Sequence, residues 1–333
     1  MVGDPSIPED ALPRDPLDQG RAIVDFTLTR RFRGRLRQGL MRDRWLYVML
    51  LFPLVHILVF LYIPMWGVTV AFKEFNVFMG YWQSPWVGLK HFQRVVEDQH
   101  FWIVFRNSLK FGIASLVLGF PAPIILALLL SQFRQQTYKG TVQTLLYIPN
   151  FISMVAIAGI MVDLLEPRTG LVNRLITLFG GTQIYFLVEP AWFLPIYIGS
   201  EVWQTTGFGM IIYLAAMSGI DPDLHEAATM DGAGRFRRAL TVTLPGIMPT
   251  IAILLILRIP TIIHANFEKI LLLYRPITYD VADVIQSYIY RKGLLGADFT
   301  YGTAAGLFLS VLSLILLAIA NSVSRRVSEY RLW

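Results

Sequence analysis

Residues 45–72 read WLYVMLLFPLVHILVFLYIPMWGVTVAF, and this stretch decides the class of the fold. It contains no Asp, Glu, Lys or Arg. It is also longer than the roughly 20 apolar residues that carry an α-helix across a bilayer. A helix satisfies its own backbone hydrogen bonds, so a run of this length and composition predicts a membrane-spanning helix.

The composition of the whole chain agrees with that prediction. Of its 333 residues, 55% are hydrophobic and 16% are charged, whereas soluble domains have roughly 25% charged residues. The mean hydropathy is +0.53. The lack of cysteine excludes disulfides and thiolate metal sites. Basic loops facing the cytoplasm explain the net charge of +6 better than nucleic-acid binding does.

Apolar stretches of spanning length recur along the chain and predict an all-α integral membrane protein with six transmembrane helices. We expect spans near 45–72, 109–131, 142–165, 193–218, 245–265 and 302–323. Residues 45–333 would then form one transmembrane domain. Residues 1–44 would form a cytoplasmic tail without a signal peptide, followed by a basic interfacial segment. The mixture of apolar residues and arginines over 25–44 suits an amphipathic helix on the inner leaflet, and a simple basic anchor fits equally well.

The distribution of basic residues predicts the orientation. Six crossings place both termini on one side, and the side with more Lys and Arg in its loops is normally cytoplasmic. The predicted cytoplasmic side carries Arg30, Arg31, Arg33, Arg35, Arg37, Arg42, Arg44, Arg134, Lys139, Arg235, Arg237, Arg238, Arg325, Arg326 and Arg331. The opposite loops carry fewer and more dispersed basic residues, among them Lys269.

The loop between the fourth and fifth expected spans has the most informative sequence, LHEAATMDGAGRFRRALTVTLPGIMP over 224–249. Asp221 can cap a short helix, Gly232 breaks it, and Pro245 can begin the next span. A short rigid helix on the cytoplasmic side can insert in a groove of a soluble partner, where Glu226 would pair with an arginine. An ordinary amphipathic loop helix fits the residue types as well.

The segment resembles the EAA loop of permease subunits of binding-protein-dependent ABC importers. In that pattern three residues separate Glu-Ala-Ala from a Gly, and nine further residues separate the Gly from an aliphatic-x-Leu-Pro end. The matching residues here are Glu226, Ala227, Ala228, Asp231, Gly232, Ala233, Val242, Leu244 and Pro245. Only Val242 departs mildly, because the family usually has Ile.

The resemblance extends over the chain apart from residues 1–40. RNSL at 106–109 and QTLLYIP at 143–149 are similar to sugar-type permeases. The C-terminal part, from residue 283 to Trp333, is similar to the branch that imports oligosaccharides from polysaccharide breakdown, such as pectin or alginate fragments.

This resemblance implies a non-catalytic permease subunit of a bacterial inner membrane. It would pair with a second homologous permease to form the path for an oligosaccharide, with acidic chains favoured. An extracytoplasmic solute-binding protein would deliver the sugar. An ATPase homodimer would carry ATP and Mg and would contact the Glu226–Ala228, Asp231–Ala233 and Leu244–Pro245 segments. No cofactor, metal or nucleic acid is expected on this chain. The sequence has no G-x-x-x-x-G-K-[ST] motif, and its histidines lack metal-ligand spacing.

Polar residues within the expected spans are candidates for the sugar path, because a charged group at a helix centre costs about 2.5–3.5 kcal/mol on insertion scales. The candidates are Glu201, Trp203, Gln204, Tyr213, Arg258, His264 and Asn266. Arg258 and His264 would suit a carboxylated sugar. The alternative is a structural ion pair, such as Arg258 with Glu201, that joins helices.

Other functions predict different sequences. An ion-coupled secondary sugar transporter would need carboxylates near the bilayer centre and inverted repeats. Only Glu201 is a candidate carboxylate, and no repeat is evident. A membrane enzyme would need paired His and acidic residues in the spans, and a regulatory subunit would lack a path of its own.

Overall fold

The computed structural model describes residues 44–133 and 135–327, and every regular element in these ranges is helical. The all-α prediction is therefore confirmed for the described part of the chain. The predicted tail and nearly all of the basic interfacial segment, residues 1–43, lie outside it. The chain divides into two units, Met1–Gly67 and Val68–Trp333. Each unit is described by itself.

The first unit is helical from Arg44 onward. It contains α2 (Arg44–Ile57), the π-helical turn η2 (Leu58–Tyr62) and the start of the 3-10 helix η3 (Ile63–Phe72). Pro64 has no N–H to donate to the carbonyl four residues earlier, and the π turn just before it absorbs this interruption. The helix Trp45–Phe72 is long and apolar enough to cross a membrane, as its sequence predicts.

The second unit contains the remaining helices. They are α3 (Gly80–Gln83), α4 (Lys90–Glu97), α5 (Gln99–Ala114), η4 (Ser115–Gly119), α6 (Pro121–Ser131), α7 (Gln136–Tyr147), η5 (Ile148–Phe151), α8 (Met154–Leu165), α9 (Leu171–Leu178), α10 (Pro190–Ser218), α11 (Pro222–Met230), α12 (Arg235–Arg238), η6 (Ala239–Thr243), α13 (Leu244–Gly246), α14 (Met248–Arg258), η7 (Ile259–Ile263), α15 (Phe267–Leu273), η8 (Pro276–Thr278), α16 (Tyr279–Ala282), α17 (Ile285–Ile289), η9 (Tyr290–Leu295) and α18 (Phe299–Val327).

Of the six expected spans, three are present as helices that are long and apolar enough to cross a membrane: Trp45–Phe72, Gln99–Ser131 and Phe299–Val323. Two bent pairs raise the number to as many as 5 if each pair is one span. The fourth expected span lies inside α10, which has 29 residues but is not among the helices that qualify as apolar spans. A count of six stays a prediction.

Both bends replace a straight helix that the sequence predicts. The third expected span turns by 98° between Thr137–Phe151 and Met154–Leu165, where the Ser153 hydroxyl caps the new helix. The fifth turns by 62° between Arg235–Gly246 and Met248–Ile263. Pro245 therefore lies before the bend, in α13, instead of opening the span as expected.

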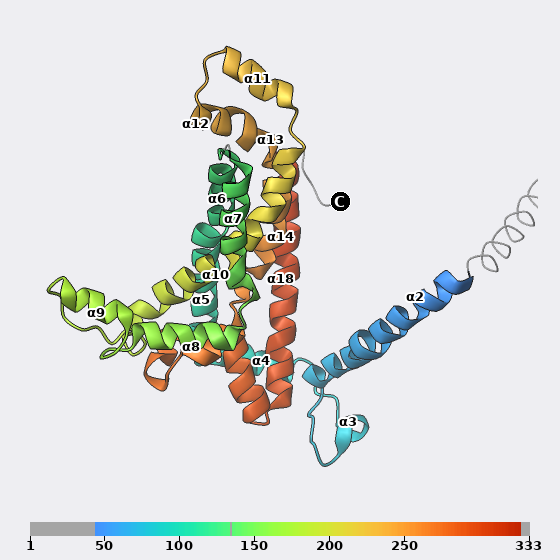
Figure 1. Ribbon diagram of the computed structural model, residues 1–333. Helices are drawn as coiled ribbons and strands as arrows, with labels where there is room; N and C mark the ends of the chain where they lie inside the picture. Colours follow the sequence, from blue (N-terminus) through green and yellow to red (C-terminus); the bar gives the residue numbers. More distant parts are fainter. Residues whose placement is uncertain (1–43, 134, 328–333) are drawn as a thin grey trace, which may run out of the picture. The chain divides into compact units, whose positions relative to one another are not determined.

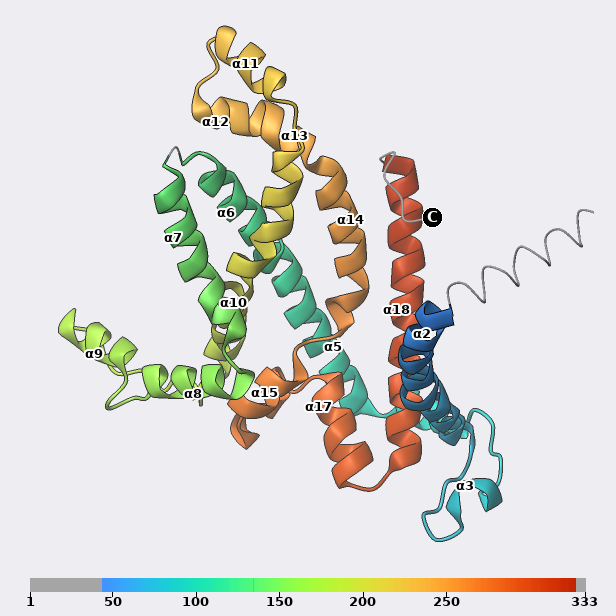
Figure 2. The same ribbon diagram turned by 45° about the vertical axis from the view of Figure 1, so that its right-hand side comes forward.

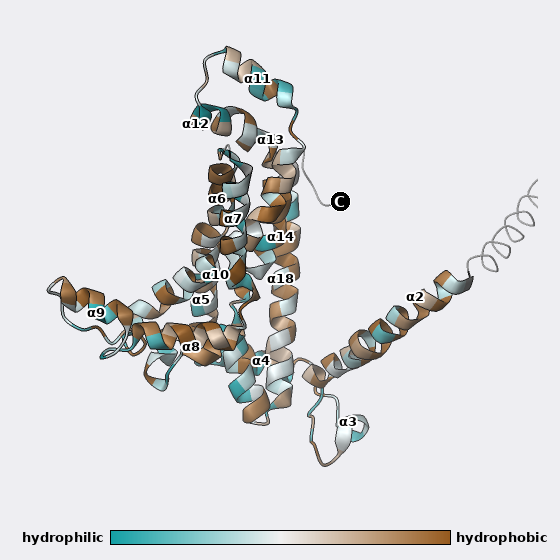
Figure 3. Ribbon diagram, viewed as in Figure 1, coloured by the Kyte–Doolittle hydropathy of each residue, from teal (hydrophilic) through white to brown (hydrophobic). Residues whose placement is uncertain are grey.

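Within the second unit, α6, α10 and α14 lie side by side (Figures 1 and 2). The α11–α12 segment projects beyond them at one end, and α8, α15 and α17 lie at the other (Figure 2). Hydrophobic residues dominate α6 and α14, whereas α12 is strongly hydrophilic (Figure 3). Small residues permit close helix packing: a Cβ added to Gly207 in α10 would lie only 1.8 Å from the backbone oxygen of Leu146 in α7.

Candidate functional site

A polar pocket of about 250 Å³ lies among α5, η4, α10, η7 and α15. Its polar lining residues are Ser115, Tyr197, Glu201, Gln204, Thr205, Arg258, Thr261, His264, Asn266 and Lys269. The structure thus brings together Glu201, Gln204, Arg258, His264 and Asn266 from the predicted path set. Residues far apart in the sequence meet here because these elements converge.

A three-way contact stands at the centre of this pocket. Arg258 donates from Nη2 to Glu201 Oε1 at 2.9 Å and to Ser115 Oγ at 2.8 Å. The Ser115 hydroxyl donates to the same carboxylate oxygen at 2.7 Å. The ion pair that the sequence offered as an alternative is therefore present, and it joins α10 to α14 and η4. Glu201 Oε2 is buried and has no hydrogen-bond partner among the described residues.

A buried lysine adds a second cation to the pocket. Lys269 is 2% exposed, and its ammonium donates to Ser200 Oγ at 3.2 Å and lies 5.2 Å from the centre of the Tyr197 ring. It belongs to α15, which follows the fifth expected span in the sequence and lies outside the candidate membrane spans. Burial lowers the pKa of Lys269 to about 8, and the charge of Glu201 opposes this shift.

The backbone at the start of α15 fixes this lysine. Asn266 Oδ1 accepts a hydrogen bond from the Lys269 N–H at 3.1 Å and caps the helix, while the Asn266 N–H donates to the Tyr197 hydroxyl at 2.7 Å. Sequence reasoning missed Lys269, Tyr197 and Ser115. For Lys269 a signal existed, because the apolar run 270–273 follows it directly and favours burial.

A second cavity, of about 240 Å³, shares Glu201, Thr205 and Arg258 with the polar pocket. Its remaining lining comes mostly from apolar residues of α6, α10 and α14, together with the buried Tyr213. The Arg258–Glu201 pair therefore borders both cavities. Trp203, also predicted for the path, is 45% exposed and lines neither of them.

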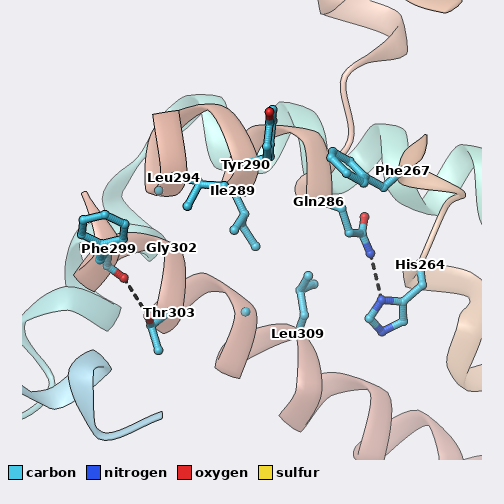
Figure 4. Close-up of a pocket in the computed structure, with 12 residues that line it drawn as sticks. His264, Phe267, Gln286, Ile289, Tyr290, Leu294, Phe299, Gly302, Thr303 and Leu309 are labelled. Carbon is cyan, nitrogen blue, oxygen red and sulfur yellow. Dashed lines mark hydrogen bonds between the residues drawn. The ribbon is translucent and has the colours of Figure 1, made fainter. Parts of the chain in front are cut away.

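A third cavity, of about 560 Å³, touches the polar pocket only through His264. Figure 4 shows Ile289, Leu294 and Leu309 around it, and the 2.8 Å hydrogen bond between Gln286 and His264 at one end. Because its lining is mainly apolar, this cavity offers a sugar few hydrogen bonds. The polar pocket is the better candidate for a carbohydrate.

The predicted loop has the expected local structure. The Asp221 carboxylate accepts a hydrogen bond from the Asp223 N–H at 3.0 Å and caps α11, and Gly232 turns the chain with a φ of +74°. Glu226 and Ala227 are exposed on α11, whereas Ala228 is half-buried. The loop therefore presents Glu226 and Ala227 outward. Asp231 and Pro245 are exposed as well, and Ala233 and Leu244 are half-buried.

A polar cluster holds the other end of the molecule together. Asp98 accepts hydrogen bonds from Lys292 at 2.6 Å, from Tyr288 at 2.6 Å and from Tyr301 at 2.8 Å. Burial opposes ionisation of Asp98, but the hydrogen bonds prevail and hold its pKa well below the usual range. Burial likewise opposes the charge of Lys292, and its hydrogen bond to Asp98 raises its pKa above the usual value.

The RNSL stretch explains how the segment around residues 280–285 is fixed. Asn107 Nδ2 donates to the carbonyls of Asp280 and Asp283, at 2.9 and 3.1 Å, and Ser108 Oγ accepts from the Ile285 N–H at 3.0 Å.

In the part of the chain that the structure describes, no three His, Asp or Glu side chains come together as metal ligands.

Comparison with known proteins agrees with this architecture. A family model described as "Binding-protein-dependent transport system inner membrane component" matches residues 119–329. The polygalacturonan/rhamnogalacturonan transport system permease protein YteP of Bacillus subtilis is 40% identical over 311 residues, which cover 93% of this chain and 97% of YteP.

Two solved structures are similar throughout. A chain of a bacterial ABC transporter involved in the import of the acidic polysaccharide alginate is 44% identical, with a TM-score of 0.81. The match covers 89% of this chain and 100% of that chain. A chain of a bacterial alginate ABC transporter in complex with an alginate pentasaccharide-bound periplasmic protein is 43% identical, with a TM-score of 0.81, and the match covers 90% of this chain and 100% of that chain.

Proposed function

We propose, from the premise that this chain belongs to the family of binding-protein-dependent transport system inner membrane components, that it forms half of the path by which an acidic oligosaccharide enters a bacterial cell. As an ABC permease subunit it is not itself catalytic. A second, homologous permease would supply the other half. Both would lie in the inner membrane, with both termini of this chain cytoplasmic.

The charge of the polar pocket is the observation that carries the preference for acidic substrates. The cations Arg258 and Lys269 line it, whereas Glu201 is the only carboxylate among its described lining residues. A pocket with this balance attracts carboxylated sugars, and charge-assisted hydrogen bonds to Arg and Lys are about twice as strong as neutral ones. The named substrates of the similar proteins, polygalacturonan and alginate, support the same choice.

The Arg258–Glu201 pair would act as a polar partition on this path. It borders the polar pocket on one side and the cavity around Tyr213 on the other. A uronate carboxylate that reaches Arg258 can replace Glu201 as its partner, so that the charge of Arg258 is never left unpaired. The same residues that join the helices would thus also contact the substrate.

The α11 loop would transmit ATPase movement. Glu226 and Ala227 point away from the rest of the chain, so a soluble subunit can reach them. An ATPase dimer would bind ATP and Mg and hold this loop. Its closure would move α10 and α14, which flank the loop, and switch access to the pocket.

The ion-coupled secondary transporter fits the site less well. Such a transporter needs a carboxylate that is free to bind and release a coupling ion. The pocket's one carboxylate, on Glu201, is already held by Arg258 and Ser115. The family match over residues 119–329 also favours the importer, and it does not depend on the geometry of the site.

The test is co-purification of this chain from its native membrane, followed by an ATPase assay with purified candidate binding proteins. Each binding protein is loaded with an oligouronate or with a neutral oligosaccharide of the same length. We expect a second permease and an ATPase to accompany the chain, and the oligouronate to stimulate hydrolysis more. If the chain purifies alone and moves sugar down an ion gradient, the proposal is refuted.

A further inference from the structure

A pocket of about 370 Å³ lies at the opposite end of the second unit from the Asp98 cluster, between the α11–α12 loop and the ends of α6, α7 and α10. It shares no residue with the three cavities described above. Its polar lining residues are Ser131, Gln132, Lys139, Ser218, His225, Arg238 and Thr243. The loop contributes His225 and Arg238, and the helix ends contribute Lys139.

The lining of this pocket is basic. Lys139, His225 and Arg238 come from three different helices, and no Asp or Glu among the described residues lines the pocket. In the described ranges, neither Lys139 nor Arg238 forms an ion pair. The charges of Lys139 and Arg238 repel one another unless an anion lies between them.

The Arg238 side chain is held in place beside the pocket. Its Nη1 donates to Thr229 Oγ1 at 2.7 Å, and this bond holds the guanidinium beside α11. Its Nε is buried and has no hydrogen-bond partner among the described residues. The guanidinium therefore offers an anion in the pocket its other N–H groups, which belong to Nη1 and Nη2.

We propose that this pocket binds a phosphate-bearing anion, and that the anion ties the α11–α12 loop to the ends of α6 and α7. A phosphate group has only acceptor oxygens, which suit a guanidinium and an ammonium that approach from different helices. Either the headgroup of an anionic lipid or a soluble phosphate compound carries this chemistry. The site is independent of the sugar path, and its test does not rely on transport.

The experiment uses the purified whole transporter and measures binding directly. Delipidated protein is titrated with phosphatidylglycerol and followed by native mass spectrometry, and is separately titrated with inorganic phosphate by calorimetry. The pocket variants are Lys139→Gln and Arg238→Gln. The matched controls are Arg235→Gln and Arg237→Gln, which remove the same charge from exposed positions of α12 outside the pocket.

Saturable binding of phosphatidylglycerol identifies a lipid site, and saturable binding of phosphate identifies a soluble ligand. In either case each pocket variant should weaken binding roughly tenfold or more, since one charge-assisted hydrogen bond is lost. The control variants should change the binding affinity by less than about twofold, because exposed charges contribute little to it.

Lys139→Gln keeps the test valid if Arg238→Gln does not fold, because the Lys139 side chain makes no described hydrogen bond. Failure of both ligands to saturate overturns the proposal, and so does an equal loss in the controls. Neither result bears on the proposed import function, which is tested by ATPase stimulation.

Discussion

Two roles of the Arg258–Glu201 pair, joining helices and contacting the substrate, can be separated by a double-mutant cycle. Arg258→Gln removes the 2.9 Å ion pair and the 2.8 Å hydrogen bond to Ser115. Hydrogen bonds to charged groups are worth about 1.5–3 kcal/mol each. The Arg258 side chain is 42% exposed, so solvent screening reduces the expected loss of stability to about 1–2 kcal/mol. Glu201→Gln should have a similar cost.

The double variant should recover most of that stability, because two amide side chains can hydrogen-bond each other and neither charge is left unpaired. It should not recover the response to acidic sugar. Without Arg258, the oligouronate concentration for half-maximal ATPase stimulation should rise roughly 10- to 100-fold, which corresponds to one lost charge-assisted bond. Stimulation by a neutral oligosaccharide of the same length should stay within about twofold.

The assay is thermal unfolding of the four purified complexes, together with ATPase titrations using loaded binding protein. The reasoning about the path is wrong if the double variant regains the wild-type response to oligouronate along with its stability. In that case the pair only joins helices. A loss of response to both sugars in equal measure would lead to the same conclusion.

Four further outcomes follow from other parts of the structure. Glu226→Ala should abolish most stimulation by loaded binding protein while the isolated ATPase subunits keep their basal rate. With its pKa at about 8, Lys269 loses its charge as the pH rises from 7 to 9. The ATPase stimulation by oligouronate, relative to that by neutral oligosaccharide, should therefore fall over this range, and Lys269→Met should remove this pH dependence. Asp98→Asn should lower the free energy of unfolding by about 2–4 kcal/mol at pH 7. Because the pKa of Asp98 is lowered by folding, this difference should shrink below about pH 4 in unfolding experiments. Gly207→Ala should lower the midpoint of unfolding through overpacking worth about 1–3 kcal/mol, whereas Gly199→Ala in the same helix has open space and should not.

Much of the site could be predicted from the sequence, because charged groups in apolar helices stand out. Glu201 and Arg258 interrupt apolar runs, and the structure pairs them. The loop could be predicted equally well, since Asp221 and Gly232 have strong local preferences for a cap and a left-handed turn. These features depend on a few neighbouring residues only.

Other features depend on tertiary packing and could not be predicted in this way. The 98° bend after Phe151 converts one expected span into two helices, although its flanks read as one apolar run. The sequence predicts that Lys269 lies in a loop opposite the cytoplasmic side, whereas the structure buries it against Tyr197 and Ser200. The apolar run 270–273 favours burial of Lys269, but the sequence does not show which helix covers it.

The helix α10 is missing from the count of apolar spans, and it also lines the polar pocket. It carries Glu201, Gln204 and Thr205 in its middle. α10 lines the polar pocket through these three residues and Tyr197. A helix facing lipid on all sides would lose several kcal/mol by carrying them, whereas a helix that faces a polar cavity does not. If the proposed path is correct, the polar residues in the middle of α10 belong to it, and the sequence already indicates them by interrupting an apolar helix.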